Sequence, residues 1–452
     1  MFKKAAALGL AFALLAAPML ANEDVAPKGI PHLDHVFVIM MENHGYQQVI
    51  NNPSEPYLNS LIANKKVNLA TNYFAVGHPS LTNYLEIVGG SNFGVRSDNA
   101  PDWHNATCTP NLATGIVNAD DAGSASNPPV VPVPPVSFES ANVCPIAGTG
   151  TDAETPAVDN WNEVAPPTFT FLADIDGVKS VPAAPTKGKT IGDQLVGAGL
   201  SWKSYQEDLP ITGADLVTYS NGTASNLTDF TPLAPLTSAS VVQAYAVKHN
   251  PFAYFKSVQE GTEFGNSLDN IVGFDGPRGL YSDLAKGDVP SLAFIAPSQC
   301  NDQHGRGNGD AFCAFDPGIG TAGLTNGTQV GLNPGLILQG DTTIERLVNA
   351  IKHSPVWHDG RTAIVIVWDE NDYSGVGGAT QPLGLFPPQN QNQVVLTVET
   401  NGEAPEGVQS SVYYNSFSLL KSLEAGFGLP CLNHACDANV NVMRDLFGQG
   451  HK

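Results

Sequence analysis

The stretch that decides the fold class is His35-Val-Phe-Val-Ile-Met-Met41, which is followed at once by Glu42-Asn43-His44. A short and nearly continuous apolar run is typical of a parallel strand that is covered on both faces. Residues 291–297 (SLAFIAP) and 362–368 (TAIVIVW) have the same character. The sequence therefore predicts at least these three segments as buried parallel strands.

Helical segments alternate with these strands. Residues 81–88 follow the first strand, and residues 342–352 precede the third with apolar side chains at helical spacing. This alternation indicates an α/β fold with a doubly wound, mostly parallel central sheet and helices on both faces. We expect a single domain over residues 30–450, and a hydrophobic fraction of 42% is enough to build its core.

Three segments differ from this pattern. Residues 100–166 are rich in Pro, Asn, Ala and Thr, and we expect them to form an irregular insertion pinned by disulfides. Residues 298–335 are dense in Gly and Asn, and residues 373–410 are dense in Gly, Gln and Pro. Both of these segments are predicted to be rich in loops.

The N-terminus has the pattern of a secretory signal peptide over residues 1–21. Lys3 and Lys4 form a basic start, an apolar stretch follows, and Ala21 is a small residue at the expected cleavage position. A membrane anchor is the alternative, although the apolar run is short for a bilayer. We therefore expect an exported protein, periplasmic or secreted, without a stable membrane span.

The six cysteines fit this location, because an even number in an exported chain indicates disulfides. Proximity in sequence suggests that Cys108 pairs with Cys144, Cys300 with Cys313, and Cys431 with Cys436, although other pairings are possible. A metal site made of cysteines is disfavoured, since the chain has no CxxC and no paired histidine spacing.

The charge of the chain limits its partners. Its formal net charge is −22, so its surface repels nucleic acid and anionic lipid headgroups at long range. We expect no nucleic-acid partner. A phosphate-bearing substrate would need cations concentrated at its site, and a metal ion would supply them.

Acidic and amide residues follow two of the predicted strands, where ligands of open α/β sheets bind. Glu42 and Asn43 follow the first strand, and Asp369 and Glu370 follow the third. A buried carboxylate is costly to desolvate without a positive partner, and oxygen ligands suit Mg²⁺, Ca²⁺ or Mn²⁺, while Zn²⁺ also accepts carboxylates. The alternative is that these residues only cap the following helices.

A candidate nucleophile lies in residues 72–84, NYFAVGHPSLTNY. Gly77 allows a tight turn and Pro79 suits the first turn of a helix, so Ser80 is expected where a helix begins. Free backbone N–H groups there would stabilise a phosphate oxygen, and a nearby metal would activate the hydroxyl. Ser80 could equally be a simple helix cap, and Thr82 is a weaker candidate in the same turn.

Seven stretches of the chain match motifs of one family, in order, over about residues 33 to 447. They are VFVIMMENHGY (36–46), NYFAVGHPSLTNYL (72–85), GLSWKSYQEDLP (199–210), VKHNPFAYF (247–255), IAPSQCNDQHG (295–305), IVIVWDENDYSG (364–375) and SLLKSLEAGFGLPCL (418–432). On these motifs the chain resembles the bacterial phosphoesterase family of acid phosphatases and phospholipases C, in the alkaline-phosphatase-like superfamily.

The resemblance implies a role for each matching residue. Ser80 would be the nucleophile and would also touch a divalent metal ion (Mg, Ca, Mn or Zn), whose other ligands would be Glu42, Asn43, Asp369 and Glu370. His249 and His304 would contact phosphate and protonate the leaving group, with His78 and Asp302 as second choices. No histidine follows the acidic pair at residues 369–370, which puts a second metal in doubt, although Asp372 could contribute.

The function implied is hydrolysis of phosphomonoesters, of acid phosphatase type, through a phosphoserine intermediate. A phospholipase C that cleaves phospholipid headgroups is the alternative, so the partner is a small phosphoester or a phospholipid. The sequence ends soon after Phe447 without an accessory domain, which favours the phosphatase. A non-catalytic, metal-stabilised envelope binding protein is the third hypothesis. Lys203 and Lys248 could add positive charge or be ordinary surface lysines.

Overall fold

The computed structural model describes most of the chain after residue 24. The described residues are 25–76, 80–93, 95, 98, 100–103, 143–150, 186–209, 244–305, 334–371, 393–402 and 406–448. The proposed signal peptide and most of the predicted insertion over residues 100–166 lie outside these ranges. Both therefore stay predictions.

A nine-stranded sheet forms the centre of the described part of the chain, in the order β10-β2-β9-β8-β1-β7-β5-β6, with β11 also paired to β2. Its strands are β1 (His35–Met41), β2 (Asn68–Phe74), β5 (Trp202–Gln206), β6 (Ile271–Val272), β7 (Leu292–Ala296), β8 (Thr362–Trp368), β9 (Gln393–Thr400), β10 (Gln409–Ser410) and β11 (Tyr414–Asn415). A separate small sheet pairs β3 (Thr149–Gly150) with β4 (Thr186–Lys187).

The three predicted strands lie side by side at the middle of this sheet. β1 runs parallel to β7 on one side and to β8 on the other, with Met41 opposite Trp368. All seven residues of β8 are buried, as a strand covered on both faces requires. Because β1 and β8 end at the same level, the residues that follow them emerge next to each other.

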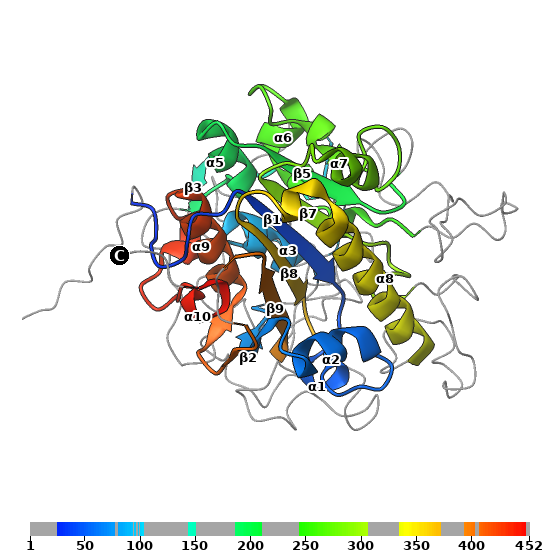
Figure 1. Ribbon diagram of the computed structural model, residues 1–452. Helices are drawn as coiled ribbons and strands as arrows, with labels where there is room; N and C mark the ends of the chain where they lie inside the picture. Colours follow the sequence, from blue (N-terminus) through cyan, green and yellow to red (C-terminus); the bar gives the residue numbers. More distant parts are fainter. Residues whose placement is uncertain are drawn as a thin grey trace, which may run out of the picture.

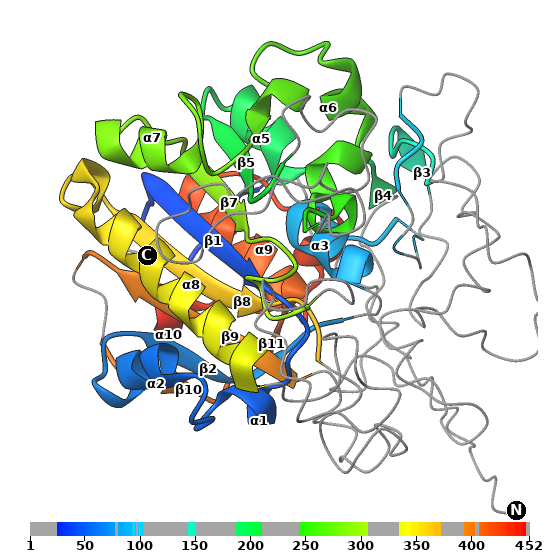
Figure 2. The same cartoon turned by 90° about the vertical axis from the view of Figure 1, so that its right-hand side faces the viewer.

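Helices cover both faces of the sheet (Figures 1 and 2). α2 (Pro56–Ala63), α7 (Leu280–Lys286) and α8 (Pro334–His353) pack on one face, and α3 (Ser80–Gly89), α5 (Ile191–Gly197) and α9 (Ser416–Phe427) pack on the other. The shorter helices are α1 (Tyr46–Val49), α6 (Lys256–Glu260) and α10 (Arg444–Phe447). Single 3₁₀ turns span Val247–His249, Pro251–Tyr254, Leu268–Asn270, Pro355–Trp357 and Asn433–Cys436. The α/β class with a mostly parallel, doubly covered sheet is confirmed.

The prediction of a loop-rich segment over residues 373–410 is wrong for its second half. Residues 393–400, QVVLTVET, form β9, which runs antiparallel to both β8 and β2. Its β-branched residues favour a strand, but the Gly, Gln and Pro around it masked that signal. β2 and β5 were also missed, because NLATNYF and WKSYQ contain too many polar residues to form an apolar run.

The predicted pairing of Cys431 with Cys436 is confirmed. Cys144 and Cys300 are disulfide-bonded as well. Cys108 and Cys313, which the sequence suggests as their partners, lie outside the described residues, so those two pairings stay predictions.

The C-terminal end of α3 offers a test of the packing. Gly90 has a φ of +73°, and a Cβ there would overlap the carbonyl oxygen of Leu432. We expect Gly90→Ala to lower the free energy of unfolding by roughly 2–4 kcal/mol, measured by urea denaturation, because both strain and a backbone clash are added.

Gly197, in α5, is the matched control. A Cβ there meets no atom within 4 Å, and this glycine is not among those with positive φ. Gly197→Ala should change the free energy of unfolding by no more than about 0.5 kcal/mol. Equal effects of the two substitutions would contradict the packing of α3 against the segment around Leu432.

Candidate active site

The side chain of Ser80 lies between the carboxylates that follow two central strands. Ser80 is the first residue of α3, and its Oγ is 3.1 Å from Glu42 Oε2 and 3.2 Å from Glu370 Oε1. Glu42 follows β1 and Glu370 follows β8 by one residue more, and all three side chains are buried. Residues far apart in the sequence therefore meet as the strand ends predicted.

Asn43 and Asp369 complete this acidic cluster. The backbone N–H of Asn43 donates to Asp369 Oδ1 at 3.1 Å, and Asn43 has a φ of +36°, which asparagine tolerates better than most residues. Asn43 Oδ1 and Asp369 Oδ2 are buried and have no hydrogen-bond partner among the described residues. Burial and the negative charges of Glu42 and Glu370 raise the pKa of Asp369 well above its ordinary value.

These features fit a hard divalent cation. Each orphaned oxygen is a good ligand for such an ion, and a cation would remove the repulsion that raises the pKa of Asp369. Ligand atoms of Glu42, Asp369 and Glu370 lie within 4.8 Å of one another, as a shared ion requires. The five sequence-predicted ligands are thus brought together by the fold, whereas their role as ligands stays a prediction.

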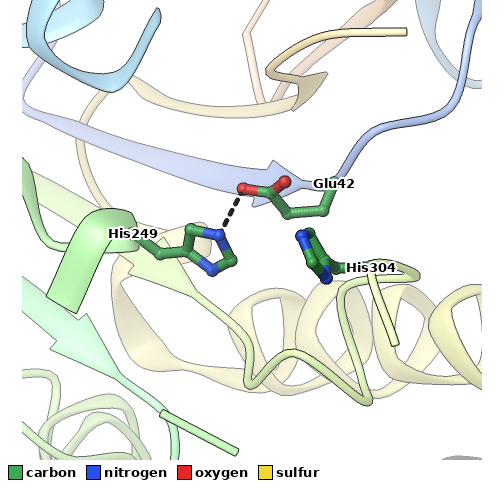
Figure 3. A group of neighbouring side chains, drawn as sticks. All are labelled: Glu42, His249 and His304. Atoms are coloured by element: carbon green, nitrogen blue, oxygen red, sulfur yellow. Dashed lines mark ion pairs between the residues drawn. The ribbon is translucent and has the colours of Figure 1, made fainter. Parts of the chain in front are cut away.

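His249 contacts the carboxylate oxygen of Glu42 that Ser80 does not (Figure 3). Its Nε2 is 2.9 Å from Glu42 Oε1 and its Nδ1 is 3.3 Å from Asp302 Oδ2, while Tyr84 stacks on the ring at 5.3 Å. Burial lowers the pKa of His249, but the charge of Glu42 and the contact with Asp302 outweigh it and raise the pKa to about 9. His249 is therefore a charged imidazolium that holds Glu42 in place.

His304 faces the same carboxylate with a different charge state (Figure 3). Burial and the ammonium of Lys248 lower the pKa of His304 to about 3, so the ring is neutral. Nδ1 is 2.9 Å from the carbonyl oxygen of Gly305, and Nε2 is 3.1 Å from Lys248 Nζ. The neutral ring thus donates from Nδ1 and accepts at Nε2.

Lys248 is a site residue that the sequence undervalued. Its Nζ lies 3.3 Å from Ser80 Oγ and 3.0 Å from Asp98 Oδ2, and its side chain is only 13% exposed. The interpretation as a surface lysine is wrong here, and its place directly before His249 in the KHNP stretch was the available signal. Lys203 instead pairs with Asp283 near the start of β5.

The first turn of α3 differs from expectation in one respect. The backbone N–H of Leu81 donates to Asp98 Oδ1 at 3.2 Å, so a carboxylate of the chain itself occupies a position that we predicted for phosphate. Asn83, which the sequence did not single out, donates to Glu370 Oε2 at 3.4 Å. His78, a second-choice site residue, lies outside the described residues.

Asp302, the other second choice, contacts His249 and not Ser80. Its Oδ1 accepts from the backbone N–H of His304 at 2.7 Å. Burial raises the pKa of Asp302, although the charge of His249 opposes this. Asp302 therefore orients both histidines and has the geometry of a positioning residue.

Comparison with known proteins identifies the family of the chain. The model of the Phosphoesterase family matches residues 49–313, which include Ser80, His249 and His304. The chain belongs to this family. The match does not extend to the acidic residues at positions 42, 369 and 370, so their assignment depends on the geometry described above.

Curated relatives of the chain include phosphatases. An acid phosphatase of Aspergillus fumigatus is 25% identical over 275 residues, which is 60% of this chain and 46% of the relative. A phosphatidylinositol-3-phosphatase of Mycobacterium tuberculosis is 34% identical over 113 residues, which is 24% of this chain and 36% of the relative. The chain thus spans about half the length, or less, of these relatives.

Among solved structures, a Vibrio parahaemolyticus protein in the alkaline phosphatase superfamily superposes with a TM-score of 0.43 at 12% identity. That superposition covers 94% of this chain and 74% of the other.

The cation site can be tested without measuring activity. After chelation, Mg²⁺, Ca²⁺, Mn²⁺ or Zn²⁺ is added singly, and at least one of them should raise the midpoint temperature of thermal unfolding. At an ion concentration near 100 times Kd, the free energy of unfolding should rise by about 3 kcal/mol. Asp369→Asn should remove most of this gain, because it deletes one charge of the ligand set.

The exposed Asp269 provides the control. Its side chain is 83% exposed, and Asp269→Asn should leave the cation-dependent gain unchanged. If Asp369→Asn keeps the full gain, the cation binds elsewhere and the site described here is not a metal site.

Proposed function

We propose that this protein is an exported, metal-dependent phosphoesterase that hydrolyses phosphomonoesters, as an acid phosphatase does, through a phosphoserine at Ser80. One domain, residues 30–450, would contain the whole site. The observation that carries the proposal is the position of Ser80 Oγ, 3.1 and 3.2 Å from the two buried carboxylates of Glu42 and Glu370. A serine that only caps a helix has no need of two such neighbours.

The first displacement uses the Ser80 hydroxyl. Its proton can pass to Glu370, whose Oε1 lies 3.2 Å from Oγ, as Oγ forms a bond to phosphorus and the ester oxygen departs. A divalent cation held by Glu42, Asn43, Ser80, Asp369 and Glu370 would lower the hydroxyl pKa and neutralise phosphoryl charge.

His304 is the better placed of the two histidines to protonate the leaving alcohol. Both nitrogens of His249 already face carboxylates, whereas His304 Nε2 and Ser80 Oγ share one neighbour, Lys248 Nζ. A phosphate dianion near His304 opposes the low pKa of the free site, so His304 takes up a proton from solvent as the substrate binds and gives it to the leaving alcohol. His249 then orients Glu42 and does not transfer the proton.

The second displacement reverses these roles. Water attacks phosphorus, the bond to Ser80 Oγ breaks, and the neutral His304 left by the first step accepts a proton from the attacking water. Ser80 recovers its proton from the carboxylate that took it. The products are inorganic phosphate and an unchanged site.

The relatives favour a phosphatase over a phospholipase C. The Aspergillus fumigatus protein is an acid phosphatase and the Mycobacterium tuberculosis protein is a phosphatidylinositol-3-phosphatase, and both names denote phosphatases. The placement of Ser80 also argues against a purely binding protein, which would not need a nucleophile beside a cation site.

Two features support export. The basic and apolar residues 1–21 have the signal-peptide pattern, and the Cys431–Cys436 disulfide suits an oxidising compartment. Among the helices that the structure describes, none is long and apolar enough to cross a membrane.

Replacing the nucleophile is the decisive test. We expect Ser80→Ala to lower kcat for 4-nitrophenyl phosphate on the order of 10⁴-fold or more while the bound divalent ion, measured by elemental analysis, remains. Thr82→Val is the matched control from the same turn, since Thr82 is the other hydroxyl candidate, and it should retain activity. Full activity of Ser80→Ala would disprove the mechanism.

Substrate class is tested by direct comparison. We expect the protein to hydrolyse 4-nitrophenyl phosphate at least about 100-fold faster, in kcat/KM, than it releases phosphocholine from phosphatidylcholine micelles. Faster cleavage of the lipid would assign it as a phospholipase C. If the untreated protein hydrolyses neither substrate and exhaustive chelation unfolds it, the hypothesis of a non-catalytic binding protein would be supported.

A further inference from the structure

Lys248 is held by three partners in the middle of the candidate site. Its Nζ lies 3.0 Å from Asp98 Oδ2, 3.1 Å from His304 Nε2 and 3.3 Å from Ser80 Oγ. An ammonium has three N–H donors, so one is available for each acceptor. A side chain that is usually mobile is thereby fixed with its charge directed at the nucleophile.

Asp98 ties this ammonium to the helix that carries Ser80. Its Oδ1 accepts from the backbone N–H of Leu81 at 3.2 Å, while its Oδ2 contacts Lys248. Lys248 comes from the 3₁₀ turn Val247–His249 and Ser80 from α3, so Asp98 adds a polar bridge between two elements that also pack through the stacking of Tyr84 on His249. This is the arrangement of a positioning residue.

The chemistry of the site indicates what the ammonium would bind. Glu42 and Glu370, the carboxylate neighbours of Ser80 Oγ, are committed to the proposed cation, so Lys248 is the positive charge that the chain itself places at this oxygen. A phosphoryl group on Oγ carries its nonbridging oxygens one bond further out, within reach of Nζ. Because the ammonium is largely buried, the local dielectric constant is low, and its interaction energy depends strongly on the charge of the ligand.

On the basis of the proposed function, we propose that Lys248 binds a nonbridging oxygen of the phosphoryl group at Ser80 and thereby selects phosphate monoesters over phosphate diesters. A monoester dianion has three nonbridging oxygens and two charges, whereas a diester has two nonbridging oxygens and one charge. The third oxygen and the second charge of the monoester are what a cation additional to the metal would recognise. Lys248 is then a specificity-determining residue.

The chain offers a matched control in Lys203. Like Lys248, it is a largely buried lysine paired with an aspartate, and its Nζ contacts Asp283 Oδ2. Its side chain is 22% exposed, against 13% for Lys248. Lys203 lies near the start of β5, away from the strand ends that meet Ser80, so its loss tests packing and fold alone.

The experiment compares Lys248→Met with Lys203→Met on two substrates that share a leaving group, 4-nitrophenyl phosphate and methyl 4-nitrophenyl phosphate. We expect Lys248→Met to lower kcat/KM for the monoester about 100-fold and for the diester less than about 5-fold. Lys203→Met should leave the ratio of the two values unchanged. Lys248→Arg, which keeps the charge, should recover part of the monoester preference.

A parallel fall for both substrates in Lys248→Met would overturn the proposal, because the lysine would then act on Ser80 and not on the phosphoryl group. The double variant Asp98→Asn with Lys248→Met does not leave the Asp98 carboxylate without its cation, and it keeps the test valid if the single variant unfolds.

Binding separates this proposal from the proposed function. In the metal-loaded protein at pH 8, calorimetry should show that Lys248→Met weakens inorganic phosphate at least about 10-fold and leaves dimethyl phosphate unchanged. If the wild-type protein hydrolyses neither ester but shows this difference, the phosphoesterase is wrong and the Lys248 site stands. If phosphate binding is unaffected, the Lys248 site is wrong whatever the activity.

Discussion

The parallel register of β1 and β8 is the constraint on which the site depends. Met41 pairs with Trp368, so the chain leaves both strands at one level and places Glu42 beside Asp369. Carboxylate oxygens of Glu42 and Asp369 lie within 4.8 Å of each other, so the two charges repel. Burying both charged groups is costly unless positive charge is placed beside them. The positive groups of the site, His249 and Lys248, stabilise part of this negative charge.

Two positive side chains offset the negative charge of Glu42. His249 contributes a fixed positive charge at 2.9 Å, and Lys248 contributes another that reaches Ser80. These charges hold the pKa of Glu42 below its usual range even though burial alone would raise it. Asp369 has no comparable cationic neighbour among the described residues, and burial with the charges of Glu42 and Glu370 raises its pKa, so a metal ion bound there would relieve this repulsion. The site thus has two regions: the proposed metal ion would bind near Asp369, and the positive side chains His249 and Lys248 lie at Glu42 and Ser80.

The sequence was sufficient for the parts of this arrangement that depend on local pattern. Continuous apolar runs predicted β1, β7 and β8, and polar residues directly after two of them predicted the acidic cluster. It was insufficient where position depends on long-range pairing. β9 is half hidden in a Gly- and Pro-rich stretch, and the importance of Lys248 and Asp98 appears only when residues 150 positions apart meet. The local signal for Lys248 is its place directly before His249, and nothing in that stretch predicts its contact with Asp98.

One buried hydrogen-bond network explains why the two halves of the site keep their relative positions. Gln303 lies between Asp302 and His304 and adopts a φ of +82°, a left-handed conformation that needs support. Its Oε1 accepts from Trp368 Nε1 at 2.9 Å, and its Nε2 donates to Glu55 at 2.8 Å. Trp368 is the last residue of β8, directly before Asp369. Gln303 therefore connects the loop that carries His304 to β8, the strand that ends just before Asp369. Its hydrogen bonds to Trp368 and Glu55 offset the backbone strain at Gln303 and hold both elements in place.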